Sequence, residues 1–229
     1  MPSLDHAAIR LLCELAHDGV WTLPQLEARR RRWNHPKVPP QFLNVSSESL
    51  RPTGWSRIAV PVDIVRPGQA AVEIARARGV DTARVRVDQI EHAVGLAELR
   101  WRCGVSAWCS ISGERLARIQ IHRGTSGDSS GFRCGPDGAY IFEQGSVFCE
   151  YDTGRYSAGQ VRGKIAAARL IRRFEGRRVI GHLWGVPTRA RSRWVRSHGV
   201  SSVAIIPSSS WLVREVSPLR SPNTHIAAT

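Results

Sequence analysis

The order of segments in the second half of the chain constrains the fold most strongly. Short apolar segments alternate there with longer segments of helical periodicity, and Gly, Pro or a capping residue bounds each one. The first is a hairpin of 139–142 with 146–152, followed by a Ser-capped helix over 157–174 and an apolar strand over 178–186. A Thr-capped basic helix over 188–199 and a buried strand over 201–207 come next. Strands that alternate with helices predict an α/β sheet domain.

This sheet domain is expected to span 113–214. A short strand over 117–121 and a Gly/Ser-rich loop over 124–135 are expected to precede the hairpin. The last residues, 215–229, contain two prolines and are expected to form a flexible tail.

The first half of the chain has a more helical pattern. Apolar residues at helical spacing predict a helix over 4–17, and a Thr cap with a Pro in the first turn predicts a short second helix. This opening resembles a helix-turn-helix. The alternating, β-branched segment 57–65 predicts a wing strand or hairpin, and Pro61 restricts it to a sheet edge.

Two further helices are expected before the sheet domain. They cover 67–79 and 87–104, and the domain boundary is expected near 105–112. The predicted fold class is therefore α+β, with a winged-helix-like helical domain over 1–104 followed by an α/β sheet domain over 113–214.

The charge balance points to a polyanionic partner. The chain has 33 Lys and Arg against 19 Asp and Glu, a formal net charge of +14, which favours nucleic acid over a merely soluble basic surface. Residues 161–196 contain eleven of these bases and a single acid, Glu175. The expected DNA contacts are Arg29, Arg30, Arg31, Arg32, Arg172, Arg173, Arg189, Arg191, Arg193 and Arg196. For the first four, a solvated helix end is the alternative.

No apolar run approaches the roughly 18 residues of a membrane span, and charged residues interrupt any signal-peptide core in the first twenty. A soluble, cytoplasmic protein is expected. The five cysteines include no C-x-x-C pair, so buried, reduced thiols are expected. A zinc site from Cys103, Cys109, Cys134 and a histidine is the alternative, although its spacing fits no standard pattern.

A local cluster of acids is the strongest chemical signal. Residues 136–154 contain four acids and no base. Asp137 begins one hairpin strand, while Glu150 and Asp152 stand two apart on the other and share a face. Gathered carboxylates repel one another unless a cation lies between them, and hard oxygen ligands suit Mg²⁺ or Mn²⁺, which can polarise a phosphate. The alternatives are a simple Asp-Gly turn at Asp137 and strand-end surface charges at Glu150 and Asp152.

These residues resemble the core of the PD-(D/E)xK nuclease superfamily. Pro136-Asp137 matches the PD motif and Glu150 matches the second acid. Asp152 stands where the usual lysine would be, but some members carry the lysine on the following helix, where Lys164 lies. The resemblance implies a nuclease-like α/β domain with catalytic residues Asp137, Glu150, Asp152 and Lys164, the three acids holding Mg²⁺ or Mn²⁺.

A broader resemblance covers most of the chain. A winged-helix-like segment, a helical connector, the PDG and EYDTG motifs and an Arg-rich helix are together similar to the replication-relaxation family of plasmid and mobile-element proteins. The resemblance implies roles in plasmid replication, relaxation or conjugative mobilisation, with double-stranded plasmid DNA and relaxosome or replication proteins as partners. A metal-dependent DNA-nicking enzyme is one reading. A non-enzymatic DNA-binding accessory or regulator with a degenerate nuclease fold is the alternative.

Aromatic side chains are secondary candidates. Tyr151 and Tyr156 could attack a phosphodiester as nucleophiles, although packing is the more common role of such tyrosines. Trp184 and Trp194 lie among arginines and could stack on bases, with a place in the core as the alternative.

Overall fold

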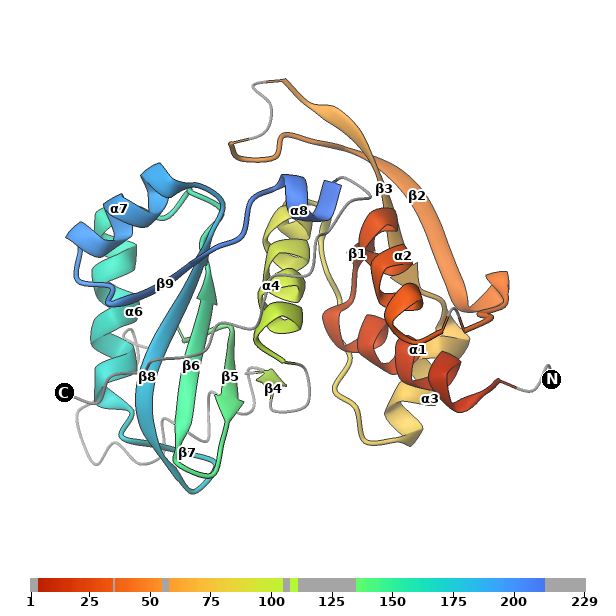
Figure 1. The fold of residues 1–229 in the computed structure, drawn as a ribbon, viewed down its shortest axis with the longest axis horizontal. Helices are drawn as coiled ribbons and strands as arrows, with labels where there is room; N and C mark the ends of the chain where they lie inside the picture. The colour runs from red at the N-terminus through yellow and green to blue at the C-terminus, as the bar shows by residue number, and fades with distance from the viewer. Residues whose placement is uncertain (1–3, 35, 55–57, 105–107, 111–134, 213–229) are drawn as a thin grey trace.

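The computed structural model describes residues 4–34, 36–54, 58–104, 108–110 and 135–212. They form a mixed α+β fold built on two sheets, one in each half of the chain (Figure 1). The helices are α1 (His6–Asp18), α2 (Leu23–Arg32), α3 (Gln69–Ala77), α4 (Ile90–Cys103), α6 (Ala158–Leu170), α7 (Arg189–Ser197) and α8 (Ser209–Leu212), with 3-10 turns η1 (Pro40–Phe42) and η2 (Val87–Gln89). The strands are β1 (Trp21–Thr22), β2 (Leu43–Leu50), β3 (Val60–Pro67), β4 (Trp108–Ser110), β5 (Gly138–Ile141), β6 (Ser146–Tyr151), β7 (Arg173–Phe174), β8 (Arg177–Val186) and β9 (Ser202–Ile205).

The N-terminal sheet has the antiparallel order β1-β3-β2. The predicted helices of this half are present as α1, α2, α3 and α4, and Thr22 caps α2 through a reciprocal capping box with Gln25. Strand β2 was not predicted, and it pairs with β3 along its whole length. Strand β3 is the central strand of this sheet, so the edge position expected from Pro61 is wrong for the strand as a whole. Beside Pro61 itself, however, β1 forms no pair, because β1 reaches only Ile64 and Val65.

The β2–β3 hairpin occupies the place where a wing was expected. The helix-turn-helix interpretation fits less well, because strand β1 separates α1 from α2. In the described part of the chain, only the 3-10 turn η1, and no further α-helix, lies between α2 and β2. The winged-helix assignment therefore stays a prediction.

The C-terminal sheet has the order β4-β5-β6-β8-β7, with β9 paired to β8. Strands β5 and β6 form the predicted antiparallel hairpin, and α6 and α7 connect the parallel pairs β6–β8 and β8–β9. Ser157 and Thr188 cap the two helices as predicted.

Two boundaries in this half differ from the sequence prediction. Helix α6 ends at Leu170 rather than near 174, because Arg173 and Phe174 pair with the start of β8 across a tight turn whose Gly176 has a φ of 74°. Strand β9 is half-exposed rather than buried, since it pairs only with β8. The strand expected over 117–121, nearly all of the 124–135 loop and the 215–229 tail lie outside the described residues, as does most of the expected boundary at 105–112.

Helix α4 packs against both halves of the molecule (Figure 1). Ile90 and Val94 join the N-terminal core, whereas Leu99 packs with Tyr140 and Tyr151 of the C-terminal sheet. The contact with β6 is close: a Cβ at Gly95 would lie 2.1 Å from the Tyr151 ring. This packing fixes one face of α4 against the sheet that carries the predicted site.

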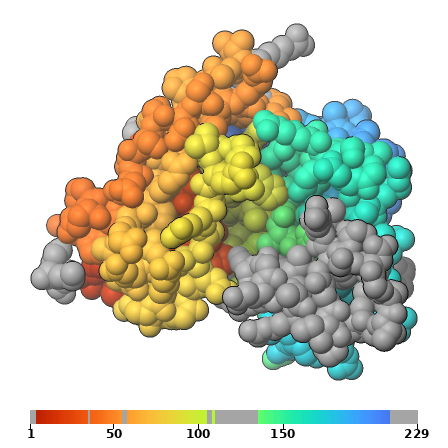
Figure 2. All heavy atoms as spheres, turned by 180° about the vertical axis from the view of Figure 1, so that it is seen from behind, coloured from red at the N-terminus to blue at the C-terminus, as the bar shows by residue number. Residues whose placement is uncertain are grey.

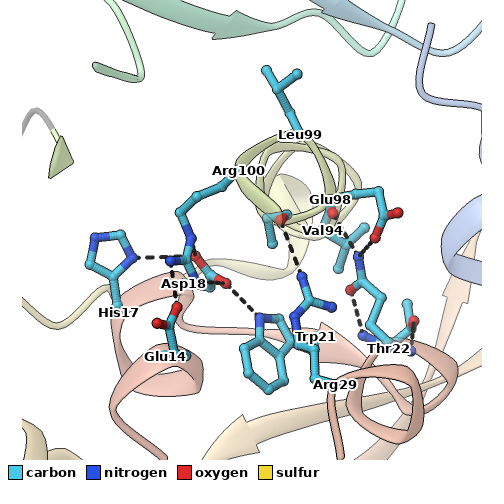
Figure 3. A network of polar contacts seen from close by, with 12 residues as sticks. Glu14, His17, Asp18, Trp21, Thr22, Arg29, Val94, Glu98, Leu99 and Arg100 are labelled. Carbon is cyan, nitrogen blue, oxygen red and sulfur yellow. Dashed lines mark hydrogen bonds and ion pairs between the residues drawn. The ribbon is translucent and has the colours of Figure 1, made fainter. Parts of the chain in front are cut away.

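A buried polar network fixes the opposite side of α4 (Figure 3). Arg100 donates to both carboxylate oxygens of Asp18 at 2.9 Å and pairs with Glu14 at 2.5 Å. Trp21 Nε1 also donates to Asp18, at 2.6 Å. The network ties α4 to α1 and holds it in one orientation.

The second half of the chain also returns to the N-terminal core. Trp211 of α8 is fully buried beside Val20, Ile64 and Val94, and its carbonyl accepts a hydrogen bond from the Thr22 hydroxyl. The two sheets are therefore joined both by α4 and by α8.

Candidate functional site

Asp137 and Glu150 lie side by side where β5 begins and β6 ends. Asp137 immediately precedes β5; its backbone N–H donates to the Cys149 carbonyl at 3.0 Å, and its Oδ2 accepts from the Tyr151 N–H at 2.9 Å. The neighbouring strand thus orients the Asp137 carboxylate by a backbone hydrogen bond. Glu150 lies on β6 and is 1% exposed, so its reading as a strand-end surface charge is wrong.

Lys164 reaches the same point from α6. Its Nζ lies 2.7 Å from Glu150 Oε2 and 4.0 Å from Asp137 Oδ1, and it donates to the Gly135 carbonyl at 3.0 Å. The hairpin strand therefore carries Glu150 and the following helix carries Lys164, as the sequence predicted.

Two histidines that the sequence analysis missed complete the cluster. His92 of α4 places Nε2 3.4 Å from Asp137 Oδ2, and His182 of β8 places Nε2 3.9 Å from Glu150 Oε1. His182 is the one polar side chain in the otherwise apolar segment 179–186 of β8, which is a usable sequence signal. His92 has none, because its contact with Asp137 depends on how α4 packs against the sheet.

The two carboxylates have opposite electrostatic environments. Burial alone would raise the pKa of Asp137, but the charge and hydrogen bond of His92, and then Lys164, outweigh it and lower the pKa. Burial and the charge of Asp137 raise the pKa of Glu150 well above its usual value, against the opposing effect of Lys164. In the protein without a bound cation, Asp137 is therefore the ionised acid and Glu150 the one that favours a proton.

The pKa values of the two histidines are also shifted in opposite directions. Burial would lower the pKa of His92, but Asp137 outweighs it and raises that pKa. Burial and then Lys164 lower the pKa of His182 to about 4, so this ring is neutral near pH 7. Trp184 Nε1 donates to His182 Nδ1 at 3.4 Å, which assigns the ring proton to Nε2.

Two buried atoms in the cluster, Glu150 Oε1 and His182 Nε2, have no hydrogen-bond partner in the described part of the chain. A buried carboxylate oxygen without a partner is costly, and in native proteins it usually marks a place for water or an ion. Among the described residues, however, no group of three or more His, Cys, Asp or Glu side chains is arranged to hold a metal ion. The residues present therefore offer two carboxylates, Asp137 and Glu150, which suffices for Mg²⁺ when water and substrate supply the other ligands.

Asp152 has a different role from the one expected. It is fully buried, and its Oδ2 pairs with Arg191 Nε and Nη2 at 2.7 and 2.6 Å. Its Oδ1 accepts from the N–H groups of Gly154 and Tyr156. These bonds occupy both oxygens in holding α7 and the 152–156 loop, so the structure brings together two of the three predicted acids and assigns Asp152 to structure.

Two of the ten predicted DNA contacts are corrected by burial. Arg29 is 2% exposed; it stacks between the rings of Trp21 and Trp101 and donates to the Ala97 carbonyl at 3.1 Å. Arg191 is committed to Asp152 and stacks on Trp194 at 3.7 Å. Neither guanidinium is available to a phosphate.

The other predicted contacts lie on the surface. Arg30 is half-buried and pairs with Glu27 at 3.0 Å. The exposed ones are Arg31, Arg32, Arg172, Arg173, Arg189, Arg193 and Arg196. Their contact with DNA stays a prediction.

The secondary candidates are mostly packing residues. Trp184 is fully buried and Tyr151 is 1% exposed, so neither can reach a base or a phosphate. Trp194 is half-buried and lies 4.2 Å from the His198 ring. Of the cysteines, Cys149 is buried as expected but Cys103 is exposed, and Cys134 lies outside the described residues.

The cluster lies between two cavities. One, of about 390 Å³, is lined by Asp137, His92 and Trp108 and by the 81–85 segment. Figure 2 shows this face, where the yellow residues before α4 approach the green and teal residues of the C-terminal sheet and α6. The other cavity, of about 620 Å³, lies between α6, β8 and the turn before β9, and His182 lines it. Asp137 thus faces the smaller cavity, and His182 lies between the larger cavity and the buried Glu150.

Comparison of the chain with protein-family models, with curated proteins and with solved structures found no match. In the described part of the chain, no helix is both long enough and apolar enough to cross a membrane.

Proposed function

We propose that this protein is a DNA-binding protein of plasmid replication, relaxation or mobilisation, and that it nicks DNA with the help of Mg²⁺ or Mn²⁺. The observation that carries the proposal is the convergence of Asp137, Glu150 and Lys164. These three residues were singled out by the nuclease-like motif, and the Lys164 ammonium of α6 lies 2.7 Å from Glu150 on β6 and 4.0 Å from Asp137 just before β5. A random set of surface charges would not be expected to meet in this way.

Asp137 and Glu150 are the residues that would hold the cation. Asp137 is already ionised and oriented by the Tyr151 N–H, and Glu150 presents an unpartnered oxygen. A divalent cation bound there polarises a phosphate and activates water near neutral pH. Lys164 supplies a positive charge beside the same point, where the phosphate gains negative charge in the transition state.

A nicking assay on supercoiled plasmid tests the proposal directly. The parent should convert supercoiled DNA to open circles with millimolar Mg²⁺ and fail to do so with EDTA. Asp137→Asn and Lys164→Met should each lower the rate by a factor of 100 or more, roughly the effect of losing one charged group from such a site. Glu143→Gln is the matched control, because Glu143 is an exposed acid of the same hairpin.

The accessory role without catalysis is the second candidate, and two observations favour it. Lys164 compensates Glu150 at 2.7 Å without any cation, and Asp152 is committed to Arg191. If the parent binds plasmid but leaves it supercoiled in both Mg²⁺ and Mn²⁺, the nicking proposal is wrong and this role replaces it.

A further inference from the structure

The larger cavity has an unusual lining. Four arginines surround it, Arg169 on α6, Arg172 and Arg173 after that helix, and Arg178 on β8. All four are exposed, and no ion pair joins any of them to another described residue. Among the described residues that line the cavity, none is acidic. We call this cavity the arginine groove.

Such a concentration of like charge is unfavourable without a partner. Guanidinium groups repel one another, and a folded protein tolerates them together where a polyanion binds. The positive surface extends beyond the groove, because Arg196 of α7 donates to the carbonyl of Ser201, which lines the opposite wall.

The size of the groove limits what it can hold. A volume of about 620 Å³ is in the range of pockets that hold a small ligand, which corresponds to a few linked groups rather than to a double helix. Trp184 lies at its floor but is fully buried, so it offers no ring face for base stacking. Contacts in the groove would therefore be made to phosphates, which carry no sequence information.

The inner end of the groove meets the acidic site. His182 lines the groove, and its Nε2 lies 3.9 Å from Glu150 Oε1. A strand held by the arginines would thus lie beside the acidic site, with the His182 ring between it and Glu150.

We infer that the arginine groove binds one strand of nucleic acid through its phosphates and holds it beside the acidic site. This inference rests on the proposed function, because it names the strand that the site would act on. It adds Arg169, Arg178 and Ser201 to the residues that the sequence analysis proposed for DNA contact.

The test is a charge-only change at Ser201, which is exposed on the wall of the groove. Ser201→Glu and Ser201→Gln place side chains of the same size there and differ only in charge. Both should be made in the Asp137→Asn background with EDTA, so that binding is measured without cleavage. The probe is a fluorescein-labelled, 20-nucleotide single-stranded DNA of mixed sequence, followed by anisotropy over a range of salt.

The Glu variant should bind the strand several-fold more weakly than the Gln variant at low salt, and the difference should shrink as salt rises. Replacing Arg169, Arg172, Arg173 and Arg178 by Gln should weaken binding about tenfold and reduce the salt slope by two to three, given about 0.7 per lost phosphate contact. The matched control replaces four exposed arginines of the N-terminal half that line neither cavity, Arg10, Arg51, Arg76 and Arg78.

Four results would overturn the inference. The Ser201 pair could bind the strand equally at every salt concentration, or the control quadruple variant could lose as much affinity as the groove variant. The pair could also differ in sedimentation with phosphatidylserine vesicles while binding DNA equally, which would make the groove a lipid-headgroup site. If the Glu and Gln variants differ in affinity for a duplex of the same sequence by the same factor as for the single strand, the single-strand assignment is wrong.

The nicking assay separates this inference from the proposed function. If the parent nicks plasmid but the two Ser201 variants bind the strand equally, the proposed function stands and the inference about the groove is wrong. If the parent never nicks but the two Ser201 variants differ in affinity, the inference about the groove stands and the proposed chemistry is wrong.

Discussion

Asp152 and Arg191 form a buried ion pair between the end of β6 and α7, with Arg191 Nη2 2.6 Å from Asp152 Oδ2. The pair joins two residues that the sequence analysis had assigned to a metal site and to DNA. Because the pair holds the loop after β6 against α7, it fixes the backbone next to Glu150 and does not act on a substrate.

This assignment predicts a loss of stability for Asp152→Asn. Removing one partner of a buried pair leaves an uncompensated charge, which typically costs about 3–5 kcal/mol. The free energy of unfolding, measured by urea denaturation, should fall by that order. An Asp152→Asn variant with the parent's stability and no response to Mg²⁺ would return Asp152 to the metal site.

Mg²⁺ should stabilise the folded protein through Asp137 and Glu150. A cation that binds only the folded state raises the melting temperature, by an amount set by its concentration relative to its Kd. Millimolar Mg²⁺ or Mn²⁺ should therefore raise the melting temperature of the parent, and Asp137→Asn and Glu150→Gln should abolish the increase. Without metal, Glu150→Gln should change stability little, because the raised pKa of Glu150 already favours its neutral form, whereas Asp137→Asn should be less stable, because the lowered pKa of Asp137 shows that the fold stabilises its charge.

Glu143→Gln serves as the control in this experiment and should respond to Mg²⁺ as the parent does. An increase of the same size in all three variants would mean that the cation binds elsewhere on the protein.

The contact of Gly95 with Tyr151 predicts opposite results for two glycine substitutions. A Cβ at Gly95 would lie 2.1 Å from the Tyr151 ring, so Gly95→Ala must displace α4 or the ring, at a cost of about 1–3 kcal/mol. At Gly163, in the middle of α6, a Cβ would meet nothing within 4 Å. Gly163→Ala should instead stabilise the protein by roughly 0.5–1 kcal/mol.

Thermal unfolding of the two alanine variants distinguishes these outcomes, and the double variant Gly95→Ala with Tyr151→Leu should recover part of the loss. Equal melting temperatures for Gly95→Ala and Gly163→Ala would show that α4 does not approach β6 closely.

The sequence predicted those parts of the fold and site that depend on local signals. Caps at Ser157 and Thr188 and the two short apolar segments of β5 and β6 are such signals, and they place Glu150 and Lys164 correctly. Strand β2 was missed because its sequence, LNVSSESL, is largely polar and most of its side chains are exposed.

What the sequence could not predict depends on tertiary packing. Four successive arginines end α2, and helical periodicity turns one of them inward, but only the packing of Trp21 and Trp101 makes Arg29 a stable buried cation. The partner of Asp152 lies 39 residues away on another helix, and His92 comes from a helix of the first half. No spacing rule connects such residues.

The ion pair of Asp18 with Arg100 predicts how the fold responds to acid. Burial would raise the pKa of Asp18, but the charge of Arg100, and then His17, lower it well below its usual value. A carboxyl whose pKa is lower in the folded state stabilises the fold above its unfolded pKa of about 3.9, and this contribution is lost as pH falls further. The free energy of unfolding of the parent should therefore fall steeply below about pH 4.

Asp18→Asn should be less stable than the parent at pH 7, and its free energy of unfolding should decline less steeply in acid. Asp63→Asn, at an exposed position on β3, is the control and should follow the parent. Urea denaturation at a series of pH values measures this, and parallel curves for the parent and Asp18→Asn would show that Asp18 does not contribute to the acid response.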